Sequence, residues 1–519
     1  MTTKFRPCVG DLMTAPARTA TPTETVAAAA SRMAEAGVGS LVVVSDEAAS
    51  MWPIGILTER DLLRCAGTGV DPTTGTVGEW MTADPDVLDT ADSIDEAWGR
   101  FAAAHYRHLP VVAGGELKGI VSVRDVMGLA QLRPADEPVV VAPPGLKGVV
   151  VAETALGDVR GAEGFYHYRQ YSAPDLAATR TFEDVWQLLI DNELPDLAAR
   201  AAFAAEVGPL RSLPAAALGV LPTIASASPS ISAGLRTMLS LVAATEDLPA
   251  SLDASPAQLR DQALRLSAVV PTIIAALHRA RSGLEPIVPR HDLGYAACYL
   301  WMLDGVEPDP VRARAIEQYL ILGIDHGFNA STFTARVVTS TGADLGAALV
   351  AALGSLSGPL HGGAPSRALD TLDAIGSPDR TAAWVRAAVA KGDRIMGFGH
   401  PVYRTADPRS VMLRSIAQNL AAAVGGAELV DFAVAVEAEV ERTLAELKPG
   451  RALHTNVEWY AAVVMQLCGL PRDLFTPTFA AARVVGWCAQ AMEQAADNRI
   501  IRPSSRYIGP PPPQPVPPI

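Results

Sequence analysis

The amino-acid sequence predicts a multidomain protein, with an N-terminal α/β pair of repeated units and a mainly α-helical C-terminal region. Three observations lead to this fold class. The chain has 519 residues, 49% of them hydrophobic and 19% charged, which is enough for several domains with buried cores. Residues 8–131 contain an internal repeat, whereas residues 146–510 show apolar residues at helical spacing.

The repeat is visible in two motifs. The segment Asp11–Thr14 has a counterpart in Glu79–Thr82, 68 positions later. The segment Gly55–Leu62 has one in Gly119–Val126, 64 positions later. Repetition at a nearly constant offset indicates two copies of one structural unit. We therefore expect two domains, which would cover residues 8–68 and 76–131.

Each copy predicts the order helix, strand, strand, helix. In the first copy an alanine-rich stretch ends at Gly37, a residue suited to a helix C-cap, and an apolar run typical of a buried strand follows. The expected helices are residues 25–36, a helix near Asp61, and residues 92–104. The expected strands are residues 40–44, 55–57, 109–112 and 119–121.

Residues 146–510 predict a mainly α-helical domain. The clearest helices are residues 182–192, 233–244, 257–281, 311–322 and 430–447. A further helix begins at Ser377-Pro378-Asp379, with an N-cap and a first-turn proline, and ends at Gly392. Proline-rich segments border this domain. We expect residues 132–145 to be a linker and residues 511–519 to be an extended tail.

Composition and charge exclude several classes of protein. The net charge is −14, and a nucleic-acid-binding protein needs a basic face, so we expect small-molecule ligands and no nucleic-acid partner. No apolar run approaches the roughly 20 residues of a membrane span, and the first residues lack a signal-peptide core, so we expect no membrane association. Five scattered cysteines without a CxxC pair favour a reducing cytoplasm and argue against a disulfide framework or a metal site.

Two histidines carry the strongest chemical signal. His361 lies within Gly358–Ala364 and His400 within Met396–Arg404, and each imidazole stands among glycines. Because glycine lets the backbone approach a ligand closely, we interpret both as site residues rather than core-filling side chains. Two further segments, Asp325–Phe333 and Asn456–Tyr460, contribute His326 and Glu458.

Arginines accompany these histidines. Arg483 stands in an otherwise apolar helix, where an unpaired guanidinium would be costly, so it needs an anionic partner from the protein or from a ligand. Arg404 and Arg409 flank Asp407-Pro408, and Arg502 lies near the C-terminus. Guanidiniums bind carboxylates in bidentate fashion. A carboxylate and two histidines beside these arginines supply the groups for general acid–base chemistry.

The repeat resembles a tandem pair of CBS (cystathionine β-synthase) domains, known as a Bateman module. The resemblance rests on the paired motifs and on Val38–Val43 and Arg107–Val112. It implies that an adenine nucleotide (ATP, ADP or AMP) binds and regulates the protein. The implied phosphate contacts are Thr58 and Ser122, and the implied ribose contacts are Asp61 and Asp125. The alternative is that these residues only cap helices.

Residues 146–510 resemble the citrate synthases of the shorter bacterial and archaeal type, with large and small helical domains. The motifs that carry the resemblance are Gly145–Thr154, Asn329–Thr332, Gly358–Ala364, Gly397–Arg409, Phe475–Pro477 and Ile501–Pro503. The resemblance implies an acyltransferase that condenses acetyl-CoA with oxaloacetate to citrate and CoA. It also implies a homodimer or higher homo-oligomer and no tightly bound cofactor.

The resemblance implies three catalytic residues. His361 would hydrogen-bond the thioester oxygen and stabilise the enol of acetyl-CoA. His400 would polarise the oxaloacetate carbonyl, and Glu458 would remove the methyl proton. The implied oxaloacetate-binding residues are His326, Arg409, Arg483 and, from the partner subunit, Arg502; Arg404 would approach the CoA phosphates.

Structural roles are the alternatives for several of these residues. His326 could face a helix C-terminus, and Arg483 could form an internal ion pair. Glu458 and Arg404 could be surface charges.

Two departures from the family pattern leave alternatives open. Glu458 stands where the family has an aspartate, and Ala364-Pro365-Ser366 replaces the commoner Ala-Asn-Glu. One alternative is a 2-methylcitrate synthase that uses propionyl-CoA. The other is a weakly active, nucleotide-sensing protein on a citrate synthase scaffold.

Overall fold

The computed structural model describes most of the chain. The described residues are 8–45, 51–104, 106–123, 125, 142–362, 364–400, 402–451, 453–510 and 512–516. They divide into two compact units, one up to Val150 and one from Val151 onward. Outside the described residues lie most of the expected linker (132–141), residues 124 and 126–131 of the second repeat, and residues 511 and 517–519 of the expected tail.

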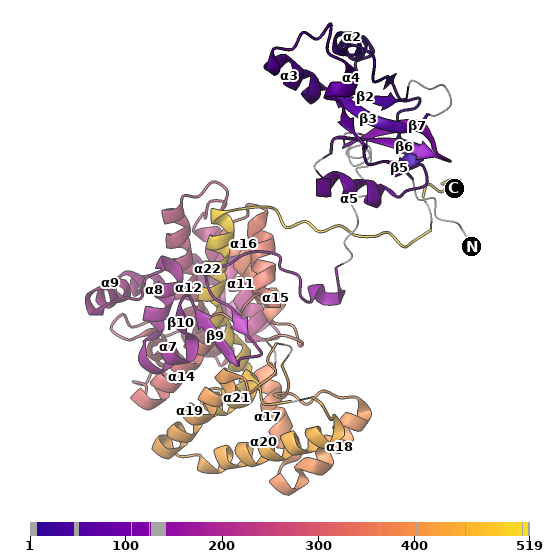
Figure 1. Cartoon of the computed structure of the whole chain (residues 1–519). Helices are drawn as coiled ribbons and strands as arrows, with labels where there is room; N and C mark the ends of the chain where they lie inside the picture. The colour runs from indigo at the N-terminus through magenta and orange to yellow at the C-terminus, as the bar shows by residue number, and fades with distance from the viewer. Residues whose placement is uncertain are drawn as a thin grey trace. The chain divides into compact units, whose positions relative to one another are not determined.

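Two small sheets and their helices form the N-terminal unit (Figure 1). The strand orders are β1-β2-β3-β4 and β5-β6-β7, and in each sheet a parallel pair is followed by antiparallel pairing. The strands are β1 (Thr19–Ala20), β2 (Ser40–Val44), β3 (Pro53–Thr58), β4 (Thr82–Ala83), β5 (Leu88–Asp89), β6 (His108–Ala113) and β7 (Glu116–Ser122). The helices are α1 (Val9–Leu12), α2 (Val26–Ala36), α3 (Glu59–Thr68), α4 (Val77–Trp80) and α5 (Ile94–Ala104). The expected elements are confirmed, except that the helix expected to close the second copy falls within residues 124–131, most of which lie outside the described residues.

The first short helix of each copy packs into the core of the other copy. Val9 of α1 is buried in the cluster of the second sheet, with Val121. Val77 of α4 is buried in the cluster of the first sheet, with Leu57. Both repeated segments are visible in the sequence, but their exchange between the two copies was not predicted from it.

The exchange gives a physical reason for the glycines of the repeated motif. A Cβ at Gly119 would lie 2.7 Å from Sδ of Met13 and 2.9 Å from the backbone oxygen of Thr14. A Cβ at Gly55 would lie 2.3 Å from Sδ of Met81. Each methionine from one copy therefore covers a glycine of the other copy's strand.

The C-terminal unit is mainly helical. Its helices are α7 (Ala173–Thr179), α8 (Phe182–Asp191), α9 (Leu197–Val207), α10 (Ala215–Ala227), α11 (Ile231–Thr245), α12 (Pro256–Arg281), α13 (Tyr295–Asp304), α14 (Pro310–Gly323), α15 (Ala330–Ser340), α16 (Leu345–Leu356), α17 (Ala364–Ile375), α18 (Thr381–Lys391), α19 (Pro408–Val424), α20 (Ala427–Leu447), α21 (Val457–Leu467) and α22 (Phe475–Ala496). Figure 1 shows α17 to α21 as one group and the remaining helices, with α22, as a larger one. The clearly periodic segments are all helices, and Gly392 ends α18 in a left-handed conformation as expected.

The core of this unit is organised around α22, which packs against α8, α11, α12 and α14 to α17. Its partner α12 is, by length and composition, long and apolar enough to cross a membrane. The prediction from sequence that no segment is long and apolar enough was therefore wrong. However, 78% of the qualifying window of α12 is buried inside the fold. The apolar character of α12 is therefore accounted for by its central place in a helical core.

A three-stranded sheet that the sequence analysis missed begins the C-terminal unit. Its order is β10-β9-β8, with β8 (Val159–Arg160), β9 (Phe165–Tyr168) and β10 (Tyr171–Ser172). The hydroxyls of Tyr166 and Tyr168 donate to backbone oxygens at the end of α14, over 3.3 and 2.8 Å. These bonds fix the start of the loop that carries His326.

Candidate active site

His400 lies in a loop that requires glycine. Gly397 and Gly399 have φ of 86° and 82°, which other residues disfavour. After His400, the backbone N–H groups of Val402 and Tyr403 donate to its Nδ1 over 3.1 and 3.3 Å. Because Nδ1 then provides a lone pair, the neutral ring carries its proton on Nε2.

The Nε2 atom of His400 is the nitrogen that faces Arg409, with 3.4 Å between Nε2 and Nη2. Both atoms carry protons in this arrangement, so they do not hydrogen-bond each other. The Nε2–H group of His400 is thus a donor that a ligand oxygen can use. A carbonyl or carboxylate placed here would accept from His400 and Arg409 together.

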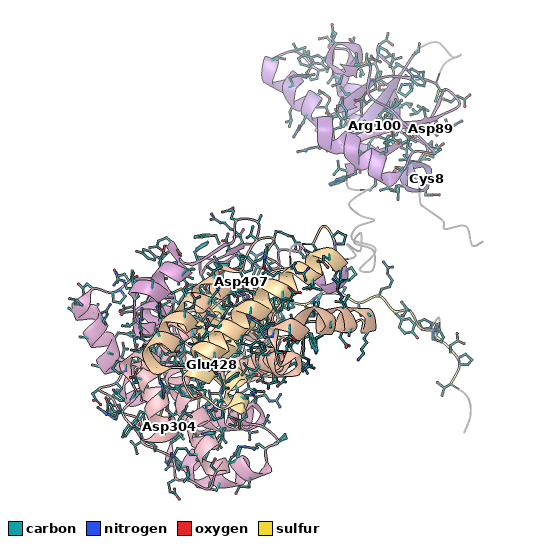
Figure 2. The ribbon with its side chains drawn as sticks, turned by 90° about the horizontal axis from the view of Figure 1, so that it is seen from below. Cys8, Asp89, Arg100, Asp304, Asp407 and Glu428 are labelled. Atoms are coloured by element: carbon teal, nitrogen blue, oxygen red, sulfur yellow. The ribbon has the colours of Figure 1, made fainter. Side chains whose placement is uncertain are left out.

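Arg409 is held at the start of α19 by Asp407, which Figure 2 labels. The Asp407 carboxylate accepts from Nε over 3.0 Å, from Nη2 over 2.7 Å and from the backbone N–H of Arg409 over 3.0 Å. Burial alone would lower the pKa of Arg409, but the adjacent carboxylate raises it above its ordinary value. Among the described residues, no partner is found for Nη1 of Arg409, which leaves it free for an anion.

Tyr403 joins His326 to this cluster. Its hydroxyl lies 2.9 Å from Nε2 of His326, and the rings of His326 and His400 are nearly perpendicular with centroids 5.4 Å apart. Burial, followed by the charge of Arg409, holds the pKa of His326 well below its ordinary value. His326 is therefore a neutral side chain at physiological pH.

Arg483 enters the cluster from the middle of α22. It is 2% exposed, its Nε donates to the backbone oxygen of Gly323 over 2.7 Å, and its guanidinium lies over the Phe479 ring. Asp325 is its nearest compensating charge: burial raises the pKa of Asp325 to about 6, while Arg483 opposes that shift. No salt bridge within 4.0 Å is found for Arg483 in the described part of the chain, so an internal ion pair does not account for it.

His361 is anchored by the first turn of α15. Its Nε2 lies 2.8 Å from Oγ of Ser331, and that oxygen also accepts from Nε1 of Trp487 over 3.2 Å and lies 2.8 Å from Oδ1 of Asn329. The single hydroxyl proton of Ser331 can go to Asn329 or to His361. When it goes to His361, the ring carries its proton on Nδ1, which then becomes a donor toward a ligand.

Glu458 stands in the first turn of α21. The side chain of Asn456 caps this helix by accepting from the backbone N–H of Glu458 over 3.1 Å. Neither a hydrogen bond nor an ion pair is found for the Glu458 carboxylate among the described residues. Burial raises its pKa above the ordinary value, with Arg409 opposing the shift. Glu458 is therefore an unpaired carboxylate, as a general base must be.

The first hairpin of the C-terminal unit packs on the segment after His400. The backbone N–H of Arg404 donates to the oxygen of Gly161 over 2.9 Å. A Cβ at Gly161 would lie 2.2 Å from the backbone oxygen of Val402, and one at Gly164 would lie 2.7 Å from Oγ1 of Thr405. The turn between β8 and β9 thus holds this loop through contacts that only glycine permits.

Two predicted site residues stand apart from the cluster. Arg502 is exposed, and neither a hydrogen bond nor an ion pair is found for it in the described chain. Arg404 is also exposed, and only its backbone takes part in a hydrogen bond that the structure records. Both guanidiniums remain available to a ligand or a partner chain.

The predicted nucleotide contacts of the N-terminal unit bond to one another in pairs, and Thr58 and Asp61 form the capping box of α3. The backbone N–H and hydroxyl of Thr58 donate to Oδ2 of Asp61 over 2.9 and 2.7 Å. Ser122 makes the same two bonds to Asp125, each over 2.7 Å. Asp61 is 6% exposed and lies 3.0 Å from Arg64. These bonds use Oδ2 of each aspartate, so a ribose would have to reach Oδ1, which in Asp61 already faces Arg64.

Sequence reasoning missed three residues of the cluster. Ser331 and Tyr403 contact two of the histidines, and Asp325 balances Arg483. Tyr403 lies three residues after His400, and this position could have indicated a contact between the two side chains. Among the described residues, no group of three or more histidine, cysteine, aspartate or glutamate side chains could hold a metal ion.

The chain matches two protein families. The family described as "Citrate synthase, C-terminal domain" matches residues 145–504. The family described as "CBS domain" matches residues 9–67 and 77–131.

Similar proteins match the C-terminal region over nearly their whole length. The citrate synthase of Deinococcus radiodurans is 36% identical over 365 residues, which are 70% of this chain and 95% of that protein. The citrate synthase of Haloferax volcanii is 37% identical over 367 residues, with the same coverage. The crystal structure of citrate synthase from Thermotoga maritima has a TM-score of 0.63 and 34% identity, and the match covers 72% of this chain and 97% of that one.

A solved complex is also similar. It is a ternary complex of carboxymethyl coenzyme A and oxaloacetate with citrate synthase from Thermoplasma acidophilum. Its TM-score is 0.67, its identity is 27%, and the match covers 72% of this chain and 98% of that one.

The histidines of the cluster should resist protonation. Burial lowers the pKa of both His361 and His400 to about 4, from an ordinary value near 6.5. In a pH titration followed by NMR, both ring signals should stay in the neutral form until the pH falls toward 4. Since the unfolded chain binds these protons near pH 6.5, their burial favours unfolding progressively as pH falls from about 6.5 to 4. Midpoints near 6.5 for both rings would contradict this account.

Proposed function

Because the chain belongs to the citrate synthase family and carries a tandem CBS region, we propose that it condenses acetyl-CoA with oxaloacetate to citrate and CoA. One observation carries the proposal. A neutral histidine with a free Nε2–H, two buried arginines and an unpaired carboxylate converge on one cluster. The complex of carboxymethyl coenzyme A and oxaloacetate with the Thermoplasma acidophilum enzyme supports the choice of both substrates.

Oxaloacetate is a dianion, and we propose that Arg409 and Arg483 bind its carboxylates. Nη1 of Arg409 has no partner in the described chain, and Arg483 has only its Nε engaged. A planar guanidinium can then offer N–H groups to a carboxylate with both ions desolvated. His326 is kept neutral, so it contributes a hydrogen bond without adding charge.

The first chemical step is removal of a methyl proton from acetyl-CoA. The Glu458 carboxylate takes this proton, and the C–H electron pair forms the carbon–carbon double bond of the enol. The proton of His361 Nδ1 stabilises the thioester oxygen as charge develops there. The hydroxyl of Ser331, which is recorded as donating to Oδ1 of Asn329, would support this tautomer if it turned to donate to Nε2 of His361.

The second step forms the new carbon–carbon bond. The enol carbon attacks the carbonyl carbon of oxaloacetate, and the carbonyl oxygen takes the proton from Nε2 of His400. The two backbone N–H groups on Nδ1 favour this direction of transfer because they hold the acceptor lone pair on the far side of the ring. Water then adds to the citryl thioester and the carbon–sulfur bond breaks. The proton held by Glu458 passes to the departing sulfur, so CoA leaves as the thiol, and a proton of the water restores Nε2 of His400.

We propose that the active form is a homodimer in which Arg502 serves the site of the partner subunit. Its exposure and its lack of a partner in the described chain are consistent with that role. Arg404 would meet the CoA phosphates for the same reason. Sedimentation of the purified chain tests the dimer, since a monomer with full activity would exclude it. All five cysteines are free, which is consistent with a cytoplasmic enzyme.

We propose that the CBS pair binds an adenine nucleotide and changes the rate of condensation. Thr58 and Ser122 would contact phosphate, and Asp61 and Asp125 would contact ribose. Both carboxylates already accept from an N–H and an O–H of the chain, which is the pattern that ribose hydroxyls would extend.

The condensation itself is tested by thiol release. With oxaloacetate and acetyl-CoA, the wild-type chain should release CoA, and His361→Ala should lower kcat by roughly 10²- to 10³-fold because one donor to the developing charge is lost. His278→Ala, which alters a histidine of α12 outside the cluster, is the control. A wild-type rate no higher than that of His361→Ala would remove the enzyme proposal.

Propionyl-CoA in the same assay separates the two acyl substrates. One methylene is worth only about 1–3 kcal/mol, so some activity with both is expected, with acetyl-CoA preferred in kcat/KM.

The base is tested at Glu458. Glu458→Gln should lower kcat by about 10²- to 10⁴-fold, because the proton acceptor is lost while the shape is kept. Glu458→Asp, which withdraws the carboxylate by one methylene, should cost roughly 10²-fold. Because burial raises the pKa of Glu458 above 4.5, kcat should fall as pH falls through a value above 4.5. Glu439→Gln, which alters a half-buried glutamate of α20 paired with Arg442, is the control, and full activity of Glu458→Gln would assign the base elsewhere.

Nucleotide regulation is tested by calorimetry and by rate. ATP, ADP and AMP are titrated into the wild type and into Asp61→Ala and Asp125→Ala, and each is added to the thiol-release assay. At least one nucleotide should bind and change the rate, and at least one variant should weaken both effects. Glu79→Ala removes the capping carboxylate at Thr76, a comparable cap in the same unit, and serves as the control for lost stability. No heat and no rate change with all three nucleotides would remove the regulatory proposal.

A further inference from the structure

We propose that Asn456 is a positioning residue that sets the separation between His400 and Glu458. The inference rests on the proposed condensation, in which these two side chains act on opposite partners of the new bond. Asn456 contacts neither reacting group. It acts through the backbone next to each of them.

Both polar atoms of the Asn456 side-chain amide are engaged, each with the backbone near one of the two residues. Oδ1 of Asn456 accepts from the backbone N–H of Glu458 over 3.1 Å. Nδ2 of the same amide donates to the backbone oxygen of Gly399 over 3.0 Å. Gly399 directly precedes His400, so a single rigid plane spans the chain at both catalytic residues.

Backbone pairing reinforces the same register. The N–H of Asn456 donates to the oxygen of Gly397 over 2.9 Å, and the N–H of Gly399 donates to the oxygen of His454 over 2.8 Å. Phe398 and Thr455 form an antiparallel bridge between these bonds. The two segments, 397–399 and 454–456, therefore pair like two short strands, and the Asn456 side chain continues the pairing beyond their end.

The pairing is supported from behind by buried groups. Ser410 donates to Oγ1 of Thr455 over 2.9 Å, and Thr455 donates to Glu437 over 2.8 Å. On the other side, the buried Trp459 ring lies against Gly397, where an added Cβ would meet it at 2.7 Å. The segment 454–456 is thus fixed to α19 and α20, and Asn456 transfers this fixed position to the His400 loop.

The chemistry explains why such a device is needed. The base and the carbonyl donor must face each other across two substrates at a separation that permits both proton transfers. A displacement of about 1 Å can cost roughly 10²-fold in rate. Glutamate reaches further than aspartate, so the backbone origin of the Glu458 side chain must be set to suit its length.

The matched variant is Asn456→Asp. Aspartate is as good a helix N-cap as asparagine, so the bond to Glu458 N–H is kept. Its second oxygen would face the oxygen of Gly399, so the bond to the His400 loop becomes a repulsion. We expect kcat to fall by about 10-fold or more. The Tm should stay close to that of wild type, and the affinity for oxaloacetate should stay within about twofold. The primary deuterium isotope effect with methyl-deuterated acetyl-CoA should rise, because proton removal becomes more strongly rate-limiting.

The control is Asp196→Asn, the converse exchange at the N-cap of α9, where the one recorded bond of the side chain among the described residues is from the N–H of Ala199. It should leave kcat and the isotope effect unchanged. Asn456→Ser, whose hydroxyl can cap but is too short to reach Gly399, covers the case in which the aspartate variant does not fold.

The outcomes separate the two proposals. An active wild type with unchanged kcat in Asn456→Asp would overturn the positioning role alone. A lower kcat together with a lower Tm and a weaker affinity for oxaloacetate, with the isotope effect unchanged in both variants, would mean that Asn456 is merely structural. That outcome would also overturn the positioning role. A wild type inactive with acetyl-CoA and propionyl-CoA would remove the proposed function, and the positioning role with it.

Discussion

Burial, reinforced by two buried arginines, keeps three histidines uncharged, and the chemistry of the cluster depends on this constraint. Burial disfavours the protonated imidazole, and the positive charge of Arg409 or Arg483 adds to this effect, so the pKa of His361 and of His400 falls to about 4. A neutral imidazole has one donor and one acceptor nitrogen. The hydrogen-bond partner of one ring nitrogen therefore decides whether the other nitrogen is a donor or an acceptor toward a ligand.

The two histidines proposed as catalytic, His361 and His400, meet this requirement in different ways. His400 uses backbone N–H groups at Nδ1, which cannot change their role, so they favour the tautomer in which Nε2, beside Arg409, is a donor. His361 uses the hydroxyl of Ser331, which can turn between two acceptors. The first arrangement suits a group that gives a proton to a carbonyl. The second suits a ring whose donor is required only when an acyl thioester is present, since a ligand oxygen at Nδ1 would select that tautomer.

Prediction from sequence succeeded where one local pattern decides the structure. The apolar run 40–44 is a buried strand, and Gly37 and Gly392 end helices in left-handed conformations. It failed where the deciding contact is distant. The exchange of α1 and α4 depends on methionines meeting glycines of the other copy, and the strands β8 to β10 are too short to show a period. Ser331 looked like an ordinary first-turn serine, because its partners His361 and Trp487 lie 30 and 156 positions away.

The charges of the cluster determine what an anionic substrate would meet there. Arg409 is matched by Asp407 and Arg483 by Asp325, and Glu458 adds a carboxylate without a partner in the described chain. With the histidines neutral, an incoming dianion would meet no net positive charge. Two sources of positive charge are available: Arg502, if it comes from a partner subunit, and a proton taken up by Asp325. The pKa of Asp325 is already about 6, and two further negative charges nearby would raise it more. An oxaloacetate site built this way requires a guanidinium from outside the cluster or a proton from solvent. The exposure of Arg502 favours the guanidinium, because a long charged side chain with no partner in its own described chain has the reach and the sign that the site lacks.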